Sequence, residues 1–271
     1  MTKKQFLVDL ERDGYVVVPG VIPQSACDGF QEAALSWLEA FPYGFKRDDK
    51  STWTAQNLPD NTMQLAMKTS FGKSGHVWGT DDLISSFDCI NITLPINAET
   101  GRTDIEPTGK WPHIDQNPRR ADRFELYQGI ANLAPNGPND GGLCLLKGSH
   151  RLIEKHLATI GGFRPDQDGG ENENSYRLID EDYEWFKAQG CEEVKVCAGP
   201  GDLIYEVLAK KLQVFKDRKL TTHWPNMNVL PEEYLSVPKR PDGSDDPANR
   251  LRPVHEPDET PQVLRLVGVR A

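Results

Sequence analysis

The alternation of apolar and polar residues in the first third of the chain predicts two helices and one strand. Apolar side chains recur three or four positions apart over residues 3–12 and 23–40, which is the spacing of an amphipathic helix. Between them, Tyr15–Val18 is an aromatic and β-branched run that ends at a Pro-Gly pair, which is typical of a strand. The chain is therefore expected to begin helix, strand, helix.

Short strands dominate the middle of the chain. They are predicted at residues 64–69, 86–94, 111–115, 124–134, 143–146, 193–198 and 202–205. A short helix is predicted over 180–188, and the apolar spacing becomes helical again from Val207 to Lys219. Many short strands, glycine-rich turns and flanking helices predict a mostly β, α+β fold, with a jelly-roll or cupin-like core behind a helical N-terminal cover.

The last part of the chain has a different composition. From residue 225 onward it is rich in proline, aspartate and arginine, with few apolar residues. We therefore predict one domain over residues 1–224 and an extended, Pro-rich and charged C-terminal tail over 225–271. No internal repeat is present.

Charge and composition exclude some classes of binding partner and some cellular compartments. The net charge is −10 and no basic run is present, which argues against nucleic-acid binding. No apolar run approaches the roughly 18 residues of a membrane span, and the N-terminus lacks a signal-peptide core. The five cysteines form no C-x-x-C pair, and the C-terminus is not a peroxisomal signal. We expect a cytoplasmic protein with reduced thiols and no membrane span; the sequence does not indicate an oligomeric state.

The segment around His113 and Asp115 carries the most distinctive chemistry. Residues two apart on an extended segment point to the same side, so this imidazole and this carboxylate are expected side by side. They are two of the three ligands of the 2-His-1-carboxylate triad that holds non-haem Fe(II) and leaves open positions. The alternative is a surface histidine and aspartate in a turn before Pro118.

Four segments resemble the phytanoyl-CoA dioxygenase family, and they occur in the family's order. They are Leu10–Ile22, His113–Pro118, Asp140–His150 and Ala198–Ile204. The similarity is closest to fungal members with a long C-terminal extension. This resemblance implies a double-stranded β-helix and an oxygenase that uses Fe(II), 2-oxoglutarate and molecular oxygen. The implied substrate is a small organic molecule, lipid-derived or a secondary metabolite, which the enzyme hydroxylates.

The resemblance also implies roles for individual residues. His113 and Asp115 would be catalytic iron ligands, whereas His150 would hold a loop near the site and would not bind metal. On the predicted strand 124–134, Gln128 and Asn132 are polar among apolar neighbours on one face. They are candidates to bind 2-oxoglutarate or substrate. The alternative is that they face solvent on a half-exposed strand.

The chain departs from the family where the third ligand is expected. In the family a histidine follows the Gly-Asp-Leu turn by about ten residues, but the residue ten after Asp202 is Leu212. The next histidine is His223, after a predicted helix, and it can supply the third ligand only if the chain folds back to bring it to the metal. We infer that a block with the distal histidine and a core strand is missing between Glu206 and Val207. Two alternatives to an active enzyme follow: a truncated, inactive oxygenase, or a cupin-like metal-binding protein.

Overall fold

The computed structural model describes residues 3–59, 91–92, 94, 112–115, 125–164, 176–209, 242–244 and 261. The chain divides into two compact units. The first unit comprises residues 1–24, 109–138 and 142–219, and the second comprises residues 25–108, 139–141 and 220–271. The candidate site lies in the first unit. The predicted boundary between residues 224 and 225 falls outside the described residues.

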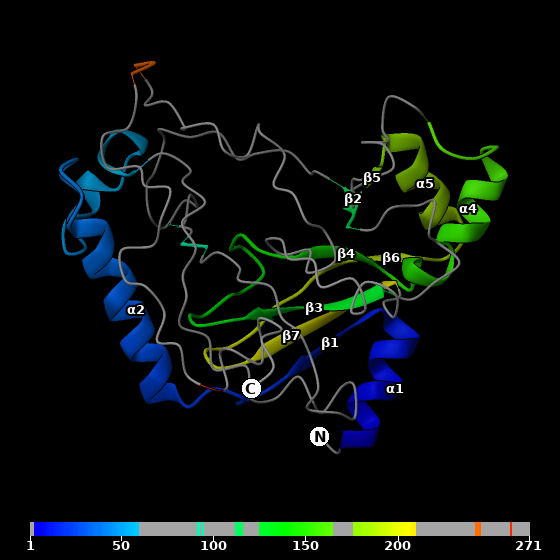
Figure 1. The fold of residues 1–271 in the computed structure, drawn as a ribbon, viewed down its shortest axis with the longest axis horizontal. Helices are drawn as coiled ribbons and strands as arrows, with labels where there is room; N and C mark the ends of the chain where they lie inside the picture. Colours follow the sequence, from blue (N-terminus) through cyan, green and yellow to red (C-terminus); the bar gives the residue numbers. More distant parts are fainter. Residues whose placement is uncertain are drawn as a thin grey trace. The chain divides into compact units, whose positions relative to one another are not determined.

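The first unit combines helices with short antiparallel strands (Figure 1). Its elements are α1 (Lys3–Asp13), β1 (Tyr15–Val18), β2 (His113–Ile114), β3 (Glu125–Ala131), β4 (Cys144–Lys147), the 3-10 turn η4 (Ser149–Arg151), α4 (Ile153–Thr159), β5 (Tyr176–Arg177), α5 (Asp180–Ala188), β6 (Glu192–Lys195) and β7 (Leu203–Ala209). The second unit contains α2 (Gln24–Glu39) and the 3-10 turns η1 (Lys50–Thr52) and η2 (Ala55–Asn57). No helix in the described part is long and apolar enough to cross a membrane.

The described strands form three antiparallel sheets, one of three strands and two of two strands. In the three-stranded sheet, β7 lies between β1 and β3, as Figure 1 shows. The other two sheets are the pairs β2–β5 and β4–β6. Purely antiparallel pairing agrees with an α+β class. No closed barrel is seen among the strands that the structure describes.

The predicted helix from Val207 onward is wrong over its first three residues. Residues 207–209 continue β7, and they pair with Glu125–Tyr127 of β3. Leu208 fits a helical stripe equally well as a strand position, so local spacing cannot separate the two. Strand β7 is continuous through Glu206 and Val207. As far as Ala209, where the described part of this segment ends, the backbone therefore lacks the change from strand to helix at residues 206 and 207 on which the missing-block hypothesis rested.

Some of the other helices and strands predicted from the sequence are confirmed, and others are not. Both N-terminal helices, the helix over 180–188 and the strand after Gly14 are confirmed to within two residues. The strand predicted over 86–94 is wrong at Asn91, Ile92 and Leu94, which lie in no strand. The strand predicted over 64–69 and residues 210–219 lie outside the described residues. Helix α4 and strand β5 were not predicted.

One apolar cluster forms the core around β5 and α5. Tyr176 and Phe186 are fully buried there, and the partly buried Ile114 of β2 packs against the cluster. The buried members are Leu146, Leu157, Tyr176, Leu178, Phe186 and Cys191. Burial of a side chain of this size contributes about 1.5–3 kcal/mol. The cluster thus holds β2 in place through Ile114, the residue between His113 and Asp115.

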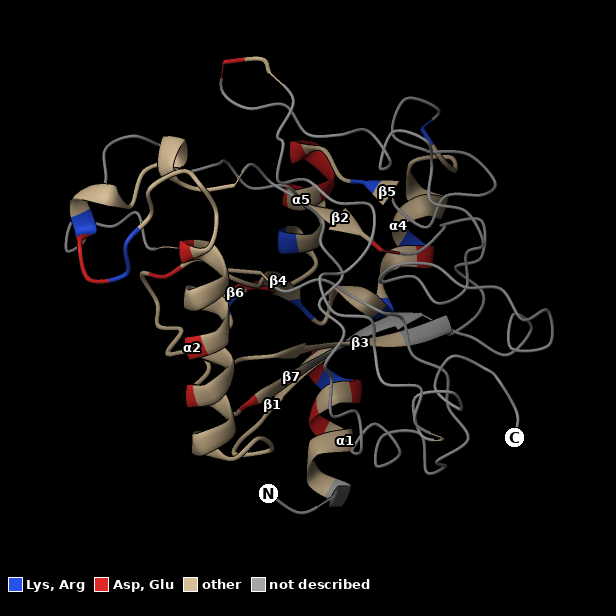
Figure 2. Ribbon diagram, turned by 60° about the vertical axis from the view of Figure 1, so that its left-hand side comes forward, with Lys and Arg blue, Asp and Glu red and all other residues tan. Residues whose placement is uncertain are grey.

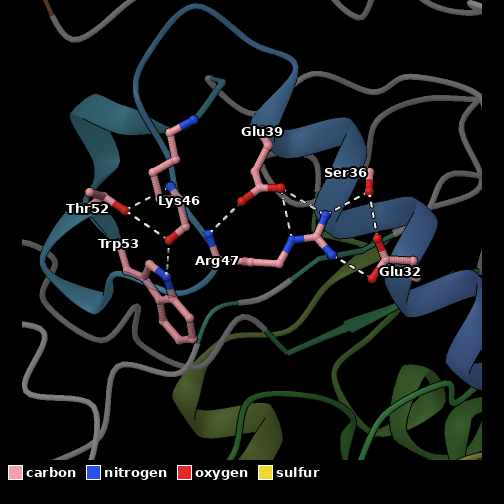
Figure 3. Close-up of polar contacts among 7 residues, drawn as sticks. All are labelled: Glu32, Ser36, Glu39, Lys46, Arg47, Thr52 and Trp53. Carbon is pink, nitrogen blue, oxygen red and sulfur yellow. Dashed lines mark hydrogen bonds and ion pairs between the residues drawn. The ribbon is translucent and has the colours of Figure 1, made fainter.

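In the second unit, Arg47 ties the loop after α2 back onto that helix. Its guanidinium donates to Glu32, Ser36 and Glu39, at 2.6, 2.7 and 2.9 Å (Figure 3). Its backbone N–H donates to the other carboxylate oxygen of Glu39, at 2.9 Å. These hydrogen bonds hold the loop against α2.

Candidate metal centre

Strand β2 presents His113 and Asp115 on the side away from the core. It pairs with β5, with Ile114 opposite Tyr176, and Leu178 N–H donates to the carbonyl of Pro112 at 3.0 Å. Ile114 packs on the apolar cluster. Because side chains alternate along an extended segment, its two neighbours point the other way. Alternation thus places His113 and Asp115 on the same side, and the packing of Ile114 turns that side away from the apolar cluster.

The two side chains approach each other closely. Nε2 of His113 lies 3.4 Å from Oδ1 of Asp115, and the side chains are 28% and 14% exposed. Metal–nitrogen and metal–oxygen bonds in proteins are about 2 Å long, so one ion between these atoms can contact both. A neutral imidazole and a carboxylate suit Fe(II) and similar divalent ions. The pair therefore fits two ligand positions of a metal site, and it is also placed to form an ion pair when His113 is protonated.

Gln128 of β3 contacts Asp115 of the pair. Its side-chain Nε2 donates to Oδ2 of Asp115 at 3.0 Å. The sequence singled out Gln128 as a ligand of the cosubstrate or substrate, and the structure brings it to the carboxylate of Asp115. Its assignment to the cosubstrate stays a prediction.

Asn132 has a structural role in this fold. It is buried, and its Nδ2 lies 2.6, 3.2 and 2.9 Å from the carbonyls of Ala134, Ala198 and Gly199. Asn132 is the first residue beyond β3, and its backbone exchanges hydrogen bonds with Gly201 and Asp202, at 2.8 and 2.9 Å. Its side-chain amide adds further bonds to the segment that precedes β7. Binding of the cosubstrate by Asn132 remains a prediction, and these bonds count against it.

His150 lies against α1. Its Nε2 is 3.0 Å from the carbonyl of Glu11, and burial lowers the pKa of this imidazole. A Cβ at Gly14, which has φ of +83°, would come 2.5 Å from Nδ1 of His150. The hydrogen bond agrees with the structural role expected for His150. Gly14 is needed both for its positive φ and for this close approach.

A third ligand is not found in the part of the chain that the structure describes. No group of three histidine, cysteine, aspartate or glutamate side chains there is arranged to hold a metal ion. His223 and His255 lie outside the described residues, as does Leu212 at the family's ligand position. A third ligand supplied by His223 therefore stays a prediction.

A buried charged cluster, which no sequence pattern indicated, joins α4, α5 and Arg164. Asp182 is fully buried and accepts from Nη1 of Arg164 at 2.7 Å and from the N–H of Ile179 at 3.0 Å. Nε2 of His156 lies 2.8 Å from Oδ1 of Asp182. Burial alone would raise the pKa of Asp182, but the bonds from Arg164 and Ile179 outweigh it and lower the pKa below its usual value.

This cluster supports the candidate site indirectly. Arg164 also interacts with Tyr176, the β5 residue opposite Ile114. Figure 2 shows acidic residues, in red, in the first turn of α5, where the helix dipole favours negative charge. The members of the buried charged cluster come from three separate segments with no fixed spacing, so no sequence motif would have revealed it.

The fold and site together define a protein with a histidine–carboxylate pair on an antiparallel framework. No protein-family model matches the chain. It is 30% identical to the Ava biosynthesis cluster protein O of Aspergillus versicolor over 219 residues, which cover 72% of this chain and 67% of the relative. The chain belongs to the family of that protein.

Solved structures give weaker likenesses. The epimerase SnoN, in complex with Fe3+, alpha ketoglutarate and nogalamycin RO, is 15% identical, with 76% of this chain and 74% of that chain covered and a TM-score of 0.37. EctD from S. alaskensis, in its apoform, is 13% identical, with 77% of this chain and 69% of that chain covered and a TM-score of 0.38. Both TM-scores are too low to bear on the fold or function of this chain.

Proposed function

We propose that the chain is a non-haem Fe(II)- and 2-oxoglutarate-dependent oxygenase of the phytanoyl-CoA dioxygenase type, with a double-stranded β-helix core. One observation carries the proposal: Nε2 of His113 and Oδ1 of Asp115 lie 3.4 Å apart on a strand fixed by the core. The four sequence segments that resemble the family lend support, since the second of them contains this pair. The antiparallel strands agree with the proposed core.

The roles of the residues follow from their positions. His113 and Asp115 would hold the iron, which together with 2-oxoglutarate and oxygen supplies the oxidation of a substrate C–H bond. The chain's own contribution is to hold these two ligands at a fixed spacing. Ile114, packed on the core, keeps both on one side of β2, and the pairing of β2 with β5 prevents the strand from turning.

The relative in Aspergillus versicolor supports a small-molecule substrate. Its name assigns it to a biosynthesis cluster. We infer that this chain also acts on a small organic molecule, a secondary metabolite or a lipid-derived compound, and that the reaction is a hydroxylation. The acidic net charge of −10 agrees with a partner other than nucleic acid.

The test is an anaerobic titration of the full chain with Fe(II) in the presence of 2-oxoglutarate. We expect a visible metal-to-ligand charge-transfer band that saturates, and that is lost in His113→Ala and in Asp115→Ala. His150→Asn is the matched control, because it replaces a histidine that contacts backbone and should leave the band intact. A folded, soluble wild-type chain without the band would refute the proposal.

His223→Ala distinguishes the proposed function from its alternative. In the part of the chain that the structure describes, no third histidine, cysteine, aspartate or glutamate joins His113 and Asp115 to form a group that could hold a metal, and this favours an inactive or cupin-like chain. Loss of the band in His223→Ala would show that residues beyond β7 complete the triad. Binding of Zn(II) or Mn(II) with no effect of 2-oxoglutarate would instead favour a metal-binding protein without oxygenase chemistry.

A further inference from the structure

Gln128 of β3 is bonded to the residue that follows β2, and β2 and β3 share no ladder among the described strands. It lies in the middle of β3, opposite Glu206 of β7, whereas Asp115 directly follows β2, which pairs only with β5 in the described part of the chain. The side-chain bond from Nε2 of Gln128 to Oδ2 of Asp115, at 3.0 Å, therefore crosses between two sheets. It ties the candidate ligand to the three-stranded sheet.

We propose that Gln128 is a positioning residue that makes Asp115 a ligand through a single oxygen. This inference rests on the proposed function, because it assigns a role at the same site. A carboxylate binds a metal through one or both oxygens, and a donor on one oxygen favours binding through the other. Gln128 occupies Oδ2, and Oδ1 is the oxygen that lies 3.4 Å from Nε2 of His113.

The chemistry of an amide suits this role. An arginine or lysine at position 128 would neutralise the carboxylate and weaken its attraction for a divalent ion. The neutral amide donates one hydrogen bond and leaves the negative charge of Asp115 available to the metal. Partners of this kind orient metal ligands, and their loss typically weakens metal binding roughly 10–100-fold.

The contrast with Asn132 shows that the bond of Gln128 is specific to the site. Both residues are polar and were expected on one face of the same strand. The amide of Asn132 donates to three backbone carbonyls, which is a structural use, whereas the amide of Gln128 donates to the candidate ligand.

The experiment measures binding of Mn(II) and Co(II) to the full chain by calorimetry. These two ions replace Fe(II) because they can be handled in air. We expect Gln128→Met, which keeps the length but removes the donor, to weaken Mn(II) binding roughly 10–100-fold. Gln5→Met is the matched control. It removes an exposed glutamine-to-aspartate hydrogen bond of 3.1 Å within α1, a helix that carries no candidate metal ligand, and should leave affinity unchanged.

Two readouts separate positioning from a merely structural role. Gln128→Met should keep the urea midpoint of the wild type, and its Co(II) spectrum should change in intensity as Asp115 switches between one-oxygen and two-oxygen binding. Gln128→Leu, a second variant without a donor, should behave in the same way. One outcome would overturn the positioning role and leave the metal site standing. In it, the wild type binds Mn(II), Asp115→Ala does not, and both Gln128 variants bind as tightly as the wild type. If the folded wild type binds neither ion, the metal site itself is overturned.

Discussion

Asp182→Asn should destabilise the first unit far more than any surface change on the same helix. Asp182 is fully buried and accepts two hydrogen bonds from Arg164 and one from the N–H of Ile179, and it contacts Nε2 of His156. Asparagine keeps one oxygen acceptor but turns an amide group toward donors. The substitution therefore leaves Arg164 facing a donor and takes away the charge that compensates it.

The magnitude follows from burial. Removing one partner of a fully buried ion pair costs about 3–5 kcal/mol, because the remaining charge is left uncompensated. The side chain of Arg164 is 28% exposed, so part of it can be rehydrated. We therefore expect a loss of about 2–4 kcal/mol in the free energy of unfolding, a large fraction of a typical 5–15 kcal/mol.

The assay is urea unfolding of the full chain at neutral pH, followed by circular dichroism. Glu184→Gln is the matched control, since Glu184 lies on the same helix and forms an exposed i,i+3 pair with Lys187. That variant should lie within about 0.5 kcal/mol of the wild type. A loss below about 1 kcal/mol for Asp182→Asn, with an unchanged slope in urea, would refute the idea that this cluster stabilises the fold.

Three further outcomes can be checked with the same chain. The folded-state pKa of Asp182 lies below its usual 3.8, so its carboxylate stabilises the folded chain fully above that pH. The difference in unfolding free energy between the wild type and Asp182→Asn should therefore shrink as the pH falls below 3.8. A difference that stays constant down to pH 2 would contradict this. Gly14→Ala should lower the unfolding free energy by about 1–3 kcal/mol more than Gly20→Ala. Both glycines have positive φ, but only at position 14 would a Cβ lie 2.5 Å from an atom of His150. Equal losses in the two variants would refute this contact. Arg47→Lys should lower the thermal midpoint, since an ammonium cannot reach all the partners of the guanidinium, and an unchanged midpoint would show that these bonds add nothing.

Local sequence patterns determined the elements whose residues contact one another along the chain. Helices α1, α2 and α5 and strand β1 follow from apolar spacing, a Pro-Gly stop and acidic residues at the start of α5. The pairing of His113 with Asp115 also follows from the sequence, because alternation in an extended segment places them on one side whatever the rest of the fold. These features depend on interactions within a few residues.

Only the tertiary structure decided the features that join distant segments. Leu208 is in a strand because β3 offers its backbone hydrogen bonds, although its spacing suits a helix equally well. The bond from Gln128 to Asp115, and the burial of Asp182 with Arg164, bring together residues from separate elements. No local pattern encodes such contacts, because the free energy that selects them comes from burying side chains and satisfying polar groups across the whole unit.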